Sequence, residues 1–499
     1  MAEGTILLCT EGTYPYAGGG VSTWCDILCN ELTEYEFVLY AVTGAPEVRL
    51  HYELPANARR LLHVPLWGVS QPADYVLAGV APRELRARRR RTTRRVVEAE
   101  FLPLLRRLMA GLEGAPAERD GRLLWELWRF FAEHDWRASW KSQAAWDLFR
   151  TELHGTHDAT VEDLAAAFGW LYHCLMPLAA PLPRTDLVHT TIAGFPGLAG
   201  IVAHYEWGTP FVVTEHGVWL RERYIAISAG DFTPFAKRFL IDLSRYVGQA
   251  NYACADVVAP VTDFNRRWEL PCGVPAERIV TIPNGVDPAL FAPRPKPART
   301  AGRPTVVAAA RVFPLKDMET MIRSAAVARR EIPDVQYLVY GSLEADRPYV
   351  ERCRALIAEL DLAGTFEFAG HHPKPAELYA DGDVCALSSI SEAFPYTVLE
   401  AMACARPVVA TDVGGVKEAL DGYGLVVAPR DHEALGAAIV TLLRDDLLRV
   451  QMGRQAREAV LARFRISSSV NGYRRLYEGQ LRPVESTEPD AAIEPAVAA

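Results

Sequence analysis

The chain has 499 residues, of which 50% are hydrophobic and 23% charged, with a formal net charge of −9 at pH 7. This length exceeds one ordinary hydrophobic core, so two or three domains are expected. The acidic balance argues against nucleic-acid affinity, which needs a basic surface. No segment approaches the ~18 apolar residues that a membrane span requires. We therefore expect a cytoplasmic protein whose partner is a small molecule or a sugar chain.

The first predicted element is an apolar strand over Thr5–Cys9, followed by a glycine-rich loop and a helical pattern over Thr23–Leu32. The loop contains Gly18, Gly19 and Gly20, and such a loop at a helix start lets the backbone approach a phosphate closely. It matches neither G-x-G-x-x-G nor a Walker loop. A glycine-rich turn without a ligand is an equally good interpretation.

Further strands are predicted in the first half, separated by helical segments. They cover Glu36–Val42, Asp186–Thr190, Phe211–Thr214, Asp256–Pro260 and Arg278–Ile282. This alternation of strands and helices is typical of a doubly wound parallel sheet.

Between about residues 71 and 183 the pattern changes to long helices, which we interpret as an insertion in the first domain. The insertion carries six of the eleven tryptophans, for which core packing is favoured over stacking on sugar rings. It also carries the arginine-rich stretch Arg86–Arg95. Docking to an acidic partner or a membrane remains an alternative for this stretch, but nearby acids favour a solvated helix face.

A proline-rich link at Pro293–Pro297 leads to a second alternating set. Its predicted strands are Thr305–Ala309, Gln336–Tyr340, Thr365–Ala369, Asp383–Ser388, Pro407–Thr411 and Gly424–Val427. Two doubly wound domains joined by a Pro/Gly hinge place a cleft between the facing carboxyl ends of their strands. A ligand is expected to bind in that cleft.

The most informative segment follows the fourth strand of the second set. Glu392 lies in the loop and Glu400 about one turn inside the next helix, which Pro395 is suited to begin. Free backbone N–H groups at this helix start would favour a bound anion, and the carboxylates could hold sugar hydroxyls. An ordinary crossover with two solvated acids is an even alternative for the segment taken alone.

Two cations follow the first strand of the second set, Arg311 and Lys316. At a strand's carboxyl end they could neutralise a diphosphate, Arg with a fork of donors and Lys with a compact charge. Asp381 and Asp383 form a D-x-D pattern that could hold a metal. They precede a strand at the end opposite the inferred site, so we interpret them as a turn and predict no metal. The scattered spacing of the nine cysteines also argues against a zinc site.

Several motifs together resemble the family-4 retaining glycosyltransferases, whose α/β GT-B fold has two facing Rossmann-like domains. They are Gly18-Gly-Gly-Val-Ser22, Thr214-Glu-His-Gly217, Ile282-Pro-Asn-Gly-Val-Asp287, Arg311 with Lys316, Glu392-x7-Glu400 with Ala401-Met-Ala403, and Gly414-Gly415. The glycine-rich loop, Arg221-Glu-Arg223 and Ser391–Thr397 look closer still to the PelF subgroup, cytosolic glycosyltransferases of Pel exopolysaccharide synthesis. Ala393 and Pro395 stand where glycines are common in the family. The phosphate contacts of that loop are therefore expected from the amides of Tyr396 and Thr397.

The resemblance implies a role for each candidate residue. Glu400 would bind the donor ribose and Glu392 the transferred sugar, while Arg311 and Lys316 would neutralise the leaving diphosphate without a metal cofactor. The amides of Gly19, Gly20, Tyr396 and Thr397 would assist them, His216 would orient the sugar from across the cleft, and His372 would lie near the base.

The expected domains are residues 1–283 on the acceptor side, residues 284–460 around the nucleotide sugar, a helix over 461–481 crossing back to the first domain, and a disordered tail over 482–499. The expected activity is transfer of a hexosyl residue from a UDP-sugar to a glycan acceptor in exopolysaccharide synthesis, in association with membrane-embedded synthase subunits. The alternatives are a nucleotide-sugar epimerase, a glycoside phosphorylase and a nucleotide-binding scaffold without catalytic activity.

Overall fold

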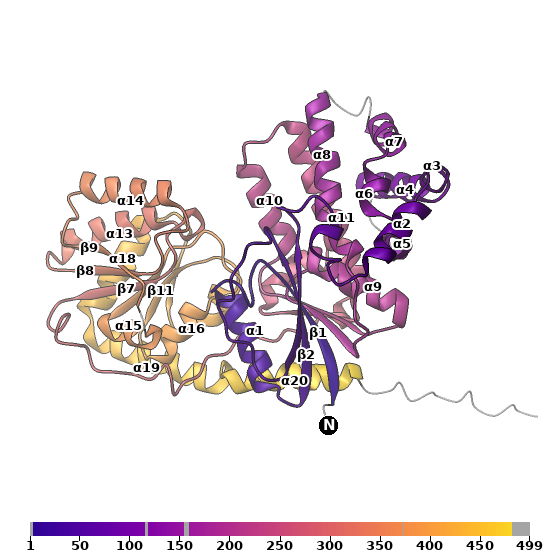
Figure 1. Cartoon of the computed structure of the whole chain (residues 1–499). Helices are drawn as coiled ribbons and strands as arrows, with labels where there is room; N and C mark the ends of the chain where they lie inside the picture. Colours follow the sequence, from indigo (N-terminus) through magenta and orange to yellow (C-terminus); the bar gives the residue numbers. More distant parts are fainter. Residues whose placement is uncertain (1–2, 115–117, 154–158, 373, 482–499) are drawn as a thin grey trace, which may run out of the picture.

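The computed structural model describes residues 3–114, 118–153, 159–372 and 374–481. It shows two lobes side by side, each built around a six-stranded sheet with helices on both faces (Figure 1). Every strand pairing is parallel. The predicted α/β class with two doubly wound sheets is therefore confirmed. The predicted tail over residues 482–499 lies outside the described residues.

The first lobe is built on the sheet order β3-β2-β1-β4-β5-β6. Its strands are β1 (Gly4–Glu11), β2 (Tyr35–Thr43), β3 (Ala58–Pro65), β4 (Leu187–Thr190), β5 (Phe211–Glu215) and β6 (Val257–Pro260). The central strands are nearly continuous apolar runs because helices cover both faces of the sheet.

Helices of the first lobe cover its sheet and extend above it. They are α1 (Gly20–Glu31), α2 (Pro82–Arg91), α3 (Arg94–Val96), α4 (Leu102–Glu113), α5 (Glu118–Glu133), α6 (Trp136–Trp140), α7 (Gln143–Leu153), α8 (Val161–Cys174), α9 (Leu198–Trp207), α10 (Trp219–Ala229), α11 (Pro234–Cys254) and α12 (Arg266–Glu269). Helices α2 to α8 lie between β3 and β4 in sequence. Their tryptophans pack in or against the main core of this lobe, as predicted, with Trp136 and Trp140 buried.

The second lobe is built on the sheet order β12-β11-β10-β7-β8-β9. Its strands are β7 (Thr305–Ala309), β8 (Gln336–Tyr340), β9 (Phe366–Gly370), β10 (Val384–Leu387), β11 (Val408–Thr411) and β12 (Leu425–Val427). Its helices are α13 (Met318–Glu331), α14 (Arg347–Glu359), α15 (Pro375–Asp381), α16 (Tyr396–Ala403), α17 (Val416–Leu420), α18 (His432–Arg444) and α19 (Asp446–Arg463).

The helix α20 (Ile466–Leu481) follows α19 and runs beneath the first lobe (Figure 1). Its buried side chains Val470, Tyr473 and Tyr477 belong to the same hydrophobic cluster as residues of β1 and α1. The Tyr477 hydroxyl lies 2.6 Å from Nδ1 of the buried His189 on β4. The last described helix is thus part of the core of the first lobe.

In the first lobe one strand was not predicted and one predicted strand is shorter than expected. The edge strand β3 was missed because Arg59 and Arg60 interrupt its apolar pattern and are exposed. The strand predicted over Arg278–Ile282 is a single bridge at Ile279. The amides of Val280 and Ile282 still donate to the carbonyls of Val258 and Pro260 in β6, at 3.0 Å and 2.9 Å.

Candidate functional site

Lys316 and Glu392 form the centre of the site. Lys316 ends the short turn after β7, and Glu392 lies in the loop after the adjacent strand β10. The Lys316 ammonium and Glu392 Oε1 form an ion pair, and the Ser389 hydroxyl donates to the same oxygen at 2.6 Å. The Ser388 hydroxyl donates to the Lys316 carbonyl at 2.8 Å, which ties the two loops together. The fold therefore places the two predicted charges in contact at the carboxyl edge of the second sheet.

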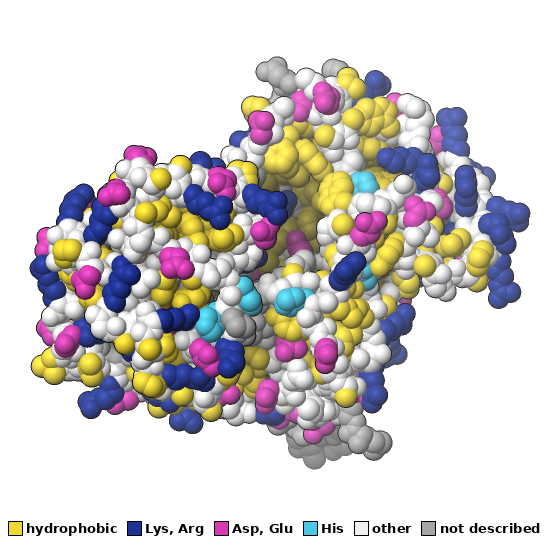
Figure 2. Space-filling model, turned by 60° about the vertical axis from the view of Figure 1, so that its left-hand side comes forward, with side chains coloured by type: hydrophobic (Ala, Val, Ile, Leu, Met, Phe, Trp, Pro, Cys, Tyr) yellow, Lys and Arg dark blue, Asp and Glu magenta, His cyan; other side chains and the backbone are white. Residues whose placement is uncertain are grey.

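The space-filling view shows the molecule hollowed between the lobes (Figure 2). Acidic side chains lie deep in the hollow, and hydrophobic side chains form much of its wall on the first lobe. The side chains of Lys316 and Glu392 are 21% and 11% exposed to solvent. Both can therefore reach a bound molecule, while partial burial strengthens their electrostatic interactions.

Glu400 lies in α16, one turn beyond its start. The Tyr379 hydroxyl donates to its Oε2 at 2.5 Å. Burial raises the pKa of Glu400 to about 7, and the tyrosine hydrogen bond opposes this rise. The other oxygen, Oε1, has no hydrogen bond to any residue in the described part of the chain, so it is available to a ligand hydroxyl.

The start of α16 offers backbone amides. Pro395 is its N-cap and supplies no side-chain hydrogen bond, so the amides of Tyr396 and Thr397 are not capped by a side chain. Pro395 has an extended backbone and precedes the helix, so it is not the first helical residue. The uncapped amides carry the positive end of the helix dipole, which favours an anion.

A second uncapped helix start faces the first from across the cleft. Helix α1 begins after Gly19, whose φ of 150° is one that glycine adopts readily, and no side chain caps the helix. A Cβ atom added at Gly20 would lie 3.3 Å from the Tyr396 ring. The β1–α1 loop and the start of α16 are therefore close neighbours.

His216 follows β5 in the first lobe and is 9% exposed. Its ring packs edge-on against Trp24 with centroids 4.5 Å apart. Burial lowers the pKa of His216 to about 3, so the imidazole is neutral at physiological pH. Its Nε2 is buried without a hydrogen-bond partner among the described residues, and such an atom is suited to a ligand hydroxyl.

Two other predicted residues make no hydrogen bond or ion pair with Lys316 or Glu392 within the described structure, although the Lys316 ammonium lies 6.0 Å from the Phe313 ring that Arg311 also covers. Arg311 is exposed after β7 and stacks over Phe313 at 5.3 Å, with no ion pair to a described residue. His372 follows β9, at the far edge of the sheet, and contacts the Tyr340 ring and the Lys374 amide. The structure does not bring His372 into contact with Glu392 or Glu400.

Arg221 and Glu222 are part of the site although the sequence did not predict them as site residues. They lie in the first turn of α10, and the Arg221 guanidinium reaches across the cleft to donate to the Ser391 hydroxyl, next to Glu392. Glu222 is solvent-exposed in the cleft, yet the surrounding protein limits its hydration and raises its pKa, with a further contribution from the negative charge of Glu392. Their position five and six residues after His216 was a usable signal.

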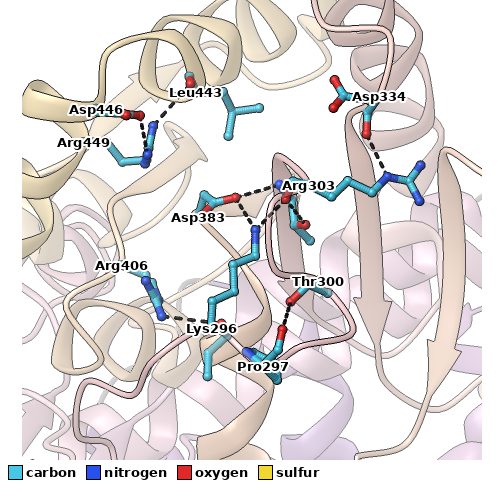
Figure 3. A network of polar contacts seen from close by, with 12 residues as sticks. Lys296, Pro297, Thr300, Arg303, Asp334, Asp383, Arg406, Leu443, Asp446 and Arg449 are labelled. Carbon is cyan, nitrogen blue, oxygen red and sulfur yellow. Dashed lines mark hydrogen bonds and ion pairs between the residues drawn. The ribbon is translucent and has the colours of Figure 1, made fainter.

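Asp381 and Asp383 hold the link between the lobes in place. Asp383 accepts from the Lys296 ammonium at 2.6 Å and from the Thr305 amide at 2.8 Å (Figure 3). Asp381 is paired with Arg299 and accepts from the Tyr340 hydroxyl at 2.7 Å. These contacts support the interpretation of the D-x-D pattern as a turn and a strand start.

The described residues contain neither a cluster of metal ligands nor a membrane-spanning helix. No group of three or more His, Cys, Asp or Glu side chains in these ranges is arranged to hold a metal ion. Among the helices of the same ranges, none has both the length and the apolar character needed to cross a membrane.

Two family models match the chain. The model for a domain of unknown function, DUF3492, matches residues 4–277. The model for glycosyl transferases group 1 matches residues 292–459. The first match covers the sheet of the first lobe with its helical insertion, and the second contains Lys316, Glu392 and Glu400.

Curated relatives include D-inositol 3-phosphate glycosyltransferases. The protein from Kineococcus radiotolerans is 31% identical over 297 residues, which are 54% of this chain and 66% of the relative. The protein from Acidothermus cellulolyticus is 32% identical over 313 residues, or 59% of this chain and 67% of the relative. The chain thus spans about two thirds of the length of these relatives.

Solved structures share the whole architecture at low sequence identity. Sucrose-phosphate synthase from Thermosynechococcus elongatus superposes with a TM-score of 0.59 at 20% identity, covering 95% of this chain and 98% of its own. Anabaena Alr3699/HepE, solved in complex with UDP-glucose, superposes with a TM-score of 0.59 at 16% identity, covering 96% of this chain and 100% of its own. These similarities establish a shared fold.

Proposed function

Because the chain belongs to the glycosyl transferases group 1 family of GT-B fold and, over its first half, to the DUF3492 family, we propose that it is a retaining glycosyltransferase. It transfers a hexosyl residue, glucosyl or N-acetylhexosaminyl, from a UDP-sugar to a glycan acceptor. The PelF-like motifs favour a role in exopolysaccharide synthesis, in the cytoplasm beside membrane-embedded synthase subunits.

The observation that carries this proposal is the contact between Lys316 and Glu392 beside the uncapped start of α16. A diphosphate seated there meets the lysine charge and the helix dipole together. Glu392 then faces the sugar attached to that diphosphate. A cation for the leaving group and a carboxylate for the sugar are the groups that glycosyl transfer requires.

The proposed step breaks the bond between the anomeric carbon and the diphosphate oxygen. The acceptor oxygen bonds to that carbon on the same face, and its proton passes to the departing phosphate oxygen. Lys316 and Arg311 stabilise the negative charge that develops on the diphosphate, with help from the helix amides. Glu392 stabilises the positive charge on the sugar ring, and the neutral His216 orients its hydroxyls. In this mechanism the protein's cations and amides replace a metal cofactor.

UDP is the proposed nucleotide. Glu400 offers Oε1 to the ribose while Tyr379 holds the other oxygen. The HepE structure in complex with UDP-glucose shares this fold and supports the choice of UDP. His372 remains the predicted residue near the base, at the edge strand of the same sheet.

Exposed aromatic rings in the first lobe support a glycan as acceptor. Trp67 and Tyr75 are 39% and 36% exposed, near the carboxyl end of β3. Between Tyr75 and Tyr16 of the glycine-rich loop lies the His63 ring, with centroid distances of 5.1 Å and 4.9 Å. Flat amphipathic surfaces of this kind suit sugar rings, which have apolar faces and polar edges.

Substitution at the centre of the site tests the proposal. Lys316→Ala and Glu392→Ala should each lower the rate of UDP release from UDP-sugar at least ~100-fold. Each residue is expected to supply a few kcal/mol of transition-state stabilisation. The control is Lys417→Ala, an exposed lysine of the same lobe. The assay first screens a panel of nucleotide sugars for thermal stabilisation and nucleotide release.

The same assay separates the alternatives. An epimerase would convert the nucleotide sugar without an acceptor, and a phosphorylase would require inorganic phosphate. A scaffold would bind UDP but release none from UDP-sugar. Near-normal turnover in folded Lys316→Ala and Glu392→Ala proteins would remove the proposed roles of both residues.

A further inference from the structure

A strongly basic surface lies on the helical insertion, away from the cleft. Helix α2 and the short α3 lie at the outer edge of the first lobe, opposite the second lobe (Figure 1). The space-filling view shows Lys and Arg side chains gathered at this edge (Figure 2). The whole protein carries a net charge of −9, so this local positive charge opposes the overall balance.

The arginines of α2 divide into two faces. Arg88 and Arg91 pair with Glu84, and they donate to the carbonyls of Phe131 and Glu133 at 3.2 Å and 3.1 Å. At 100° per residue these three charged side chains lie within an arc of about 60°. This face therefore attaches α2 to the end of α5.

The opposite face, here called the arginine face, consists of Arg83, Arg86, Arg89 and Arg90. The four residues lie within an arc of about 120° centred almost opposite the paired face. All four are exposed, and none forms an ion pair with a residue in the described ranges. The exposed Arg95 of α3 is also without such a pair. The nearby acids are used elsewhere, since Glu84 belongs to the paired face and Glu98 pairs with Arg94.

We propose that the arginine face docks the protein onto an anionic phospholipid bilayer. Guanidinium forks suit phosphodiester oxygens, and residues 82–95 contain eight arginines and no lysine. No residue of α2 is buried, so the helix lies on the molecular surface, where it can approach a flat partner. Its position leaves the cleft accessible while the protein is bound to the bilayer.

The chemistry of the arginine face predicts how binding depends on lipid and salt. It carries charge without a large exposed apolar side chain, so binding depends on anionic headgroups and weakens with salt. Each arginine near such a surface strengthens binding about 5-fold. The inference rests on the geometry of α2 and does not depend on the proposed transferase activity.

Cosedimentation with vesicles tests the proposal. Vesicles of phosphatidylglycerol and phosphatidylcholine are compared with vesicles of phosphatidylcholine alone, at low and high KCl. The wild-type protein should sediment only with the anionic vesicles at low salt. The fourfold variant Arg83→Gln, Arg86→Gln, Arg89→Gln and Arg90→Gln should lower the partition coefficient at least ~100-fold.

A matched variant controls for net charge. Arg323→Gln, Arg330→Gln, Arg430→Gln and Arg475→Gln remove four exposed arginines from other surfaces and produce the same net charge. This protein should partition within ~3-fold of the wild type if local charge near the bilayer governs binding. Both variants should retain the wild-type melting temperature, because the arginine face makes no ion pair within the described structure.

Three results would overturn the proposal. One is a wild-type protein that stays in the supernatant with anionic vesicles at low salt. Another is an equal loss of binding in the two fourfold variants. The third is a wild-type protein that does not sediment with vesicles but binds immobilised polyglutamate through the arginine face. That result would identify an acidic polypeptide as the partner of this surface.

Discussion

The carboxyl group of Glu400 is the clearest titratable feature of the site. Its pKa is raised to about 7 by burial, so folding favours the protonated form. This preference contributes in full to the free energy of unfolding at pH values below the ordinary carboxyl pKa. It is lost as pH rises through about 7. In mildly alkaline solution without nucleotide sugar, the buried and ionised Glu400 therefore lowers the free energy of unfolding.

Glu400→Gln should remove that cost, since glutamine keeps an acceptor for the Tyr379 hydroxyl and carries no charge. The variant is expected to be more stable than the wild type at pH 8, on the order of 1–3 kcal/mol. At pH 4.5 the two proteins should be nearly equal. Thermal unfolding without nucleotide at both pH values measures the difference. An equal difference at the two pH values would contradict the assigned pKa.

The residues of the site differ in how far the sequence could predict them. Lys316 and Glu392 were expected at strand ends, and the strand order brings those ends together. The position of Arg221 soon after His216 was a signal for the site, but its contact with Ser391 could not be predicted because the two residues lie in different lobes. The contact between Glu400 and Tyr379 likewise depends on packing, because Tyr379 lies in another helix.

At the scale of elements, the loop carrying Glu392 is held by two glycines after β11. Gly414 has a φ of 59°, and a Cβ atom there would lie 1.9 Å from the Glu392 carbonyl oxygen. At Gly415 a Cβ atom would lie 2.7 Å from the Ala393 carbonyl oxygen. The absence of side chains at these positions allows the two loops to touch.

Gly414→Ala should therefore displace the Glu392 loop. We expect a loss of stability of about 2–4 kcal/mol, because a backbone clash adds to the strained conformation. Donor turnover should fall with it. Gly422→Ala is the matched control, since Gly422 has a φ of 84° but no atom within 4 Å of its added Cβ. It should cost only about 1 kcal/mol and leave turnover unchanged. Equal effects of the two substitutions on turnover would contradict this account.

Strand prediction succeeded where apolar runs are uninterrupted. The bounds of β7 and β8 match the predicted ranges, because both strands are buried on both faces. The edge strand β3 is buried only at its C-terminal end, and its arginines interrupt the apolar pattern that predicts a strand. The segment after β6 looked like a strand because its apolar residues alternate, and Ile279 and Ile282 are indeed buried while Val280 is exposed. It forms a single bridge at Ile279.

At the scale of the whole molecule, the two lobes are joined by side chains as well as by the link. The Thr262 hydroxyl of the first lobe donates to Glu418 of α17 at 2.5 Å, and the Arg221 guanidinium of α10 donates to the Ser391 hydroxyl of the second lobe. Helix α20 adds a larger connection through its buried tyrosines. The stability of the first lobe therefore depends on residues at the far end of the sequence.

Tyr477 tests that dependence. Tyr477→Ala removes a fully buried ring from the core of the first lobe and should cost about 3–5 kcal/mol. Tyr477→Phe keeps the ring and removes only the hydroxyl beside His189, so it should cost about 1 kcal/mol. Thermal unfolding combined with limited proteolysis of the first lobe measures both losses. Equal losses in the two variants, or a loss confined to the second lobe, would contradict the assigned packing.

The position of α20 also sets the order in which the protein can be made. Tyr477 and His189 are separated by 288 positions in the sequence, and the ribosome adds roughly 5–20 residues each second. Strand β4 thus waits roughly 15–60 s in the nascent chain for the helix that packs against it. During that time Ile6, Leu8 and Leu187 lack their tyrosine neighbours. Synthesis therefore passes through an intermediate with an exposed apolar face, which chaperones can bind until α20 is made.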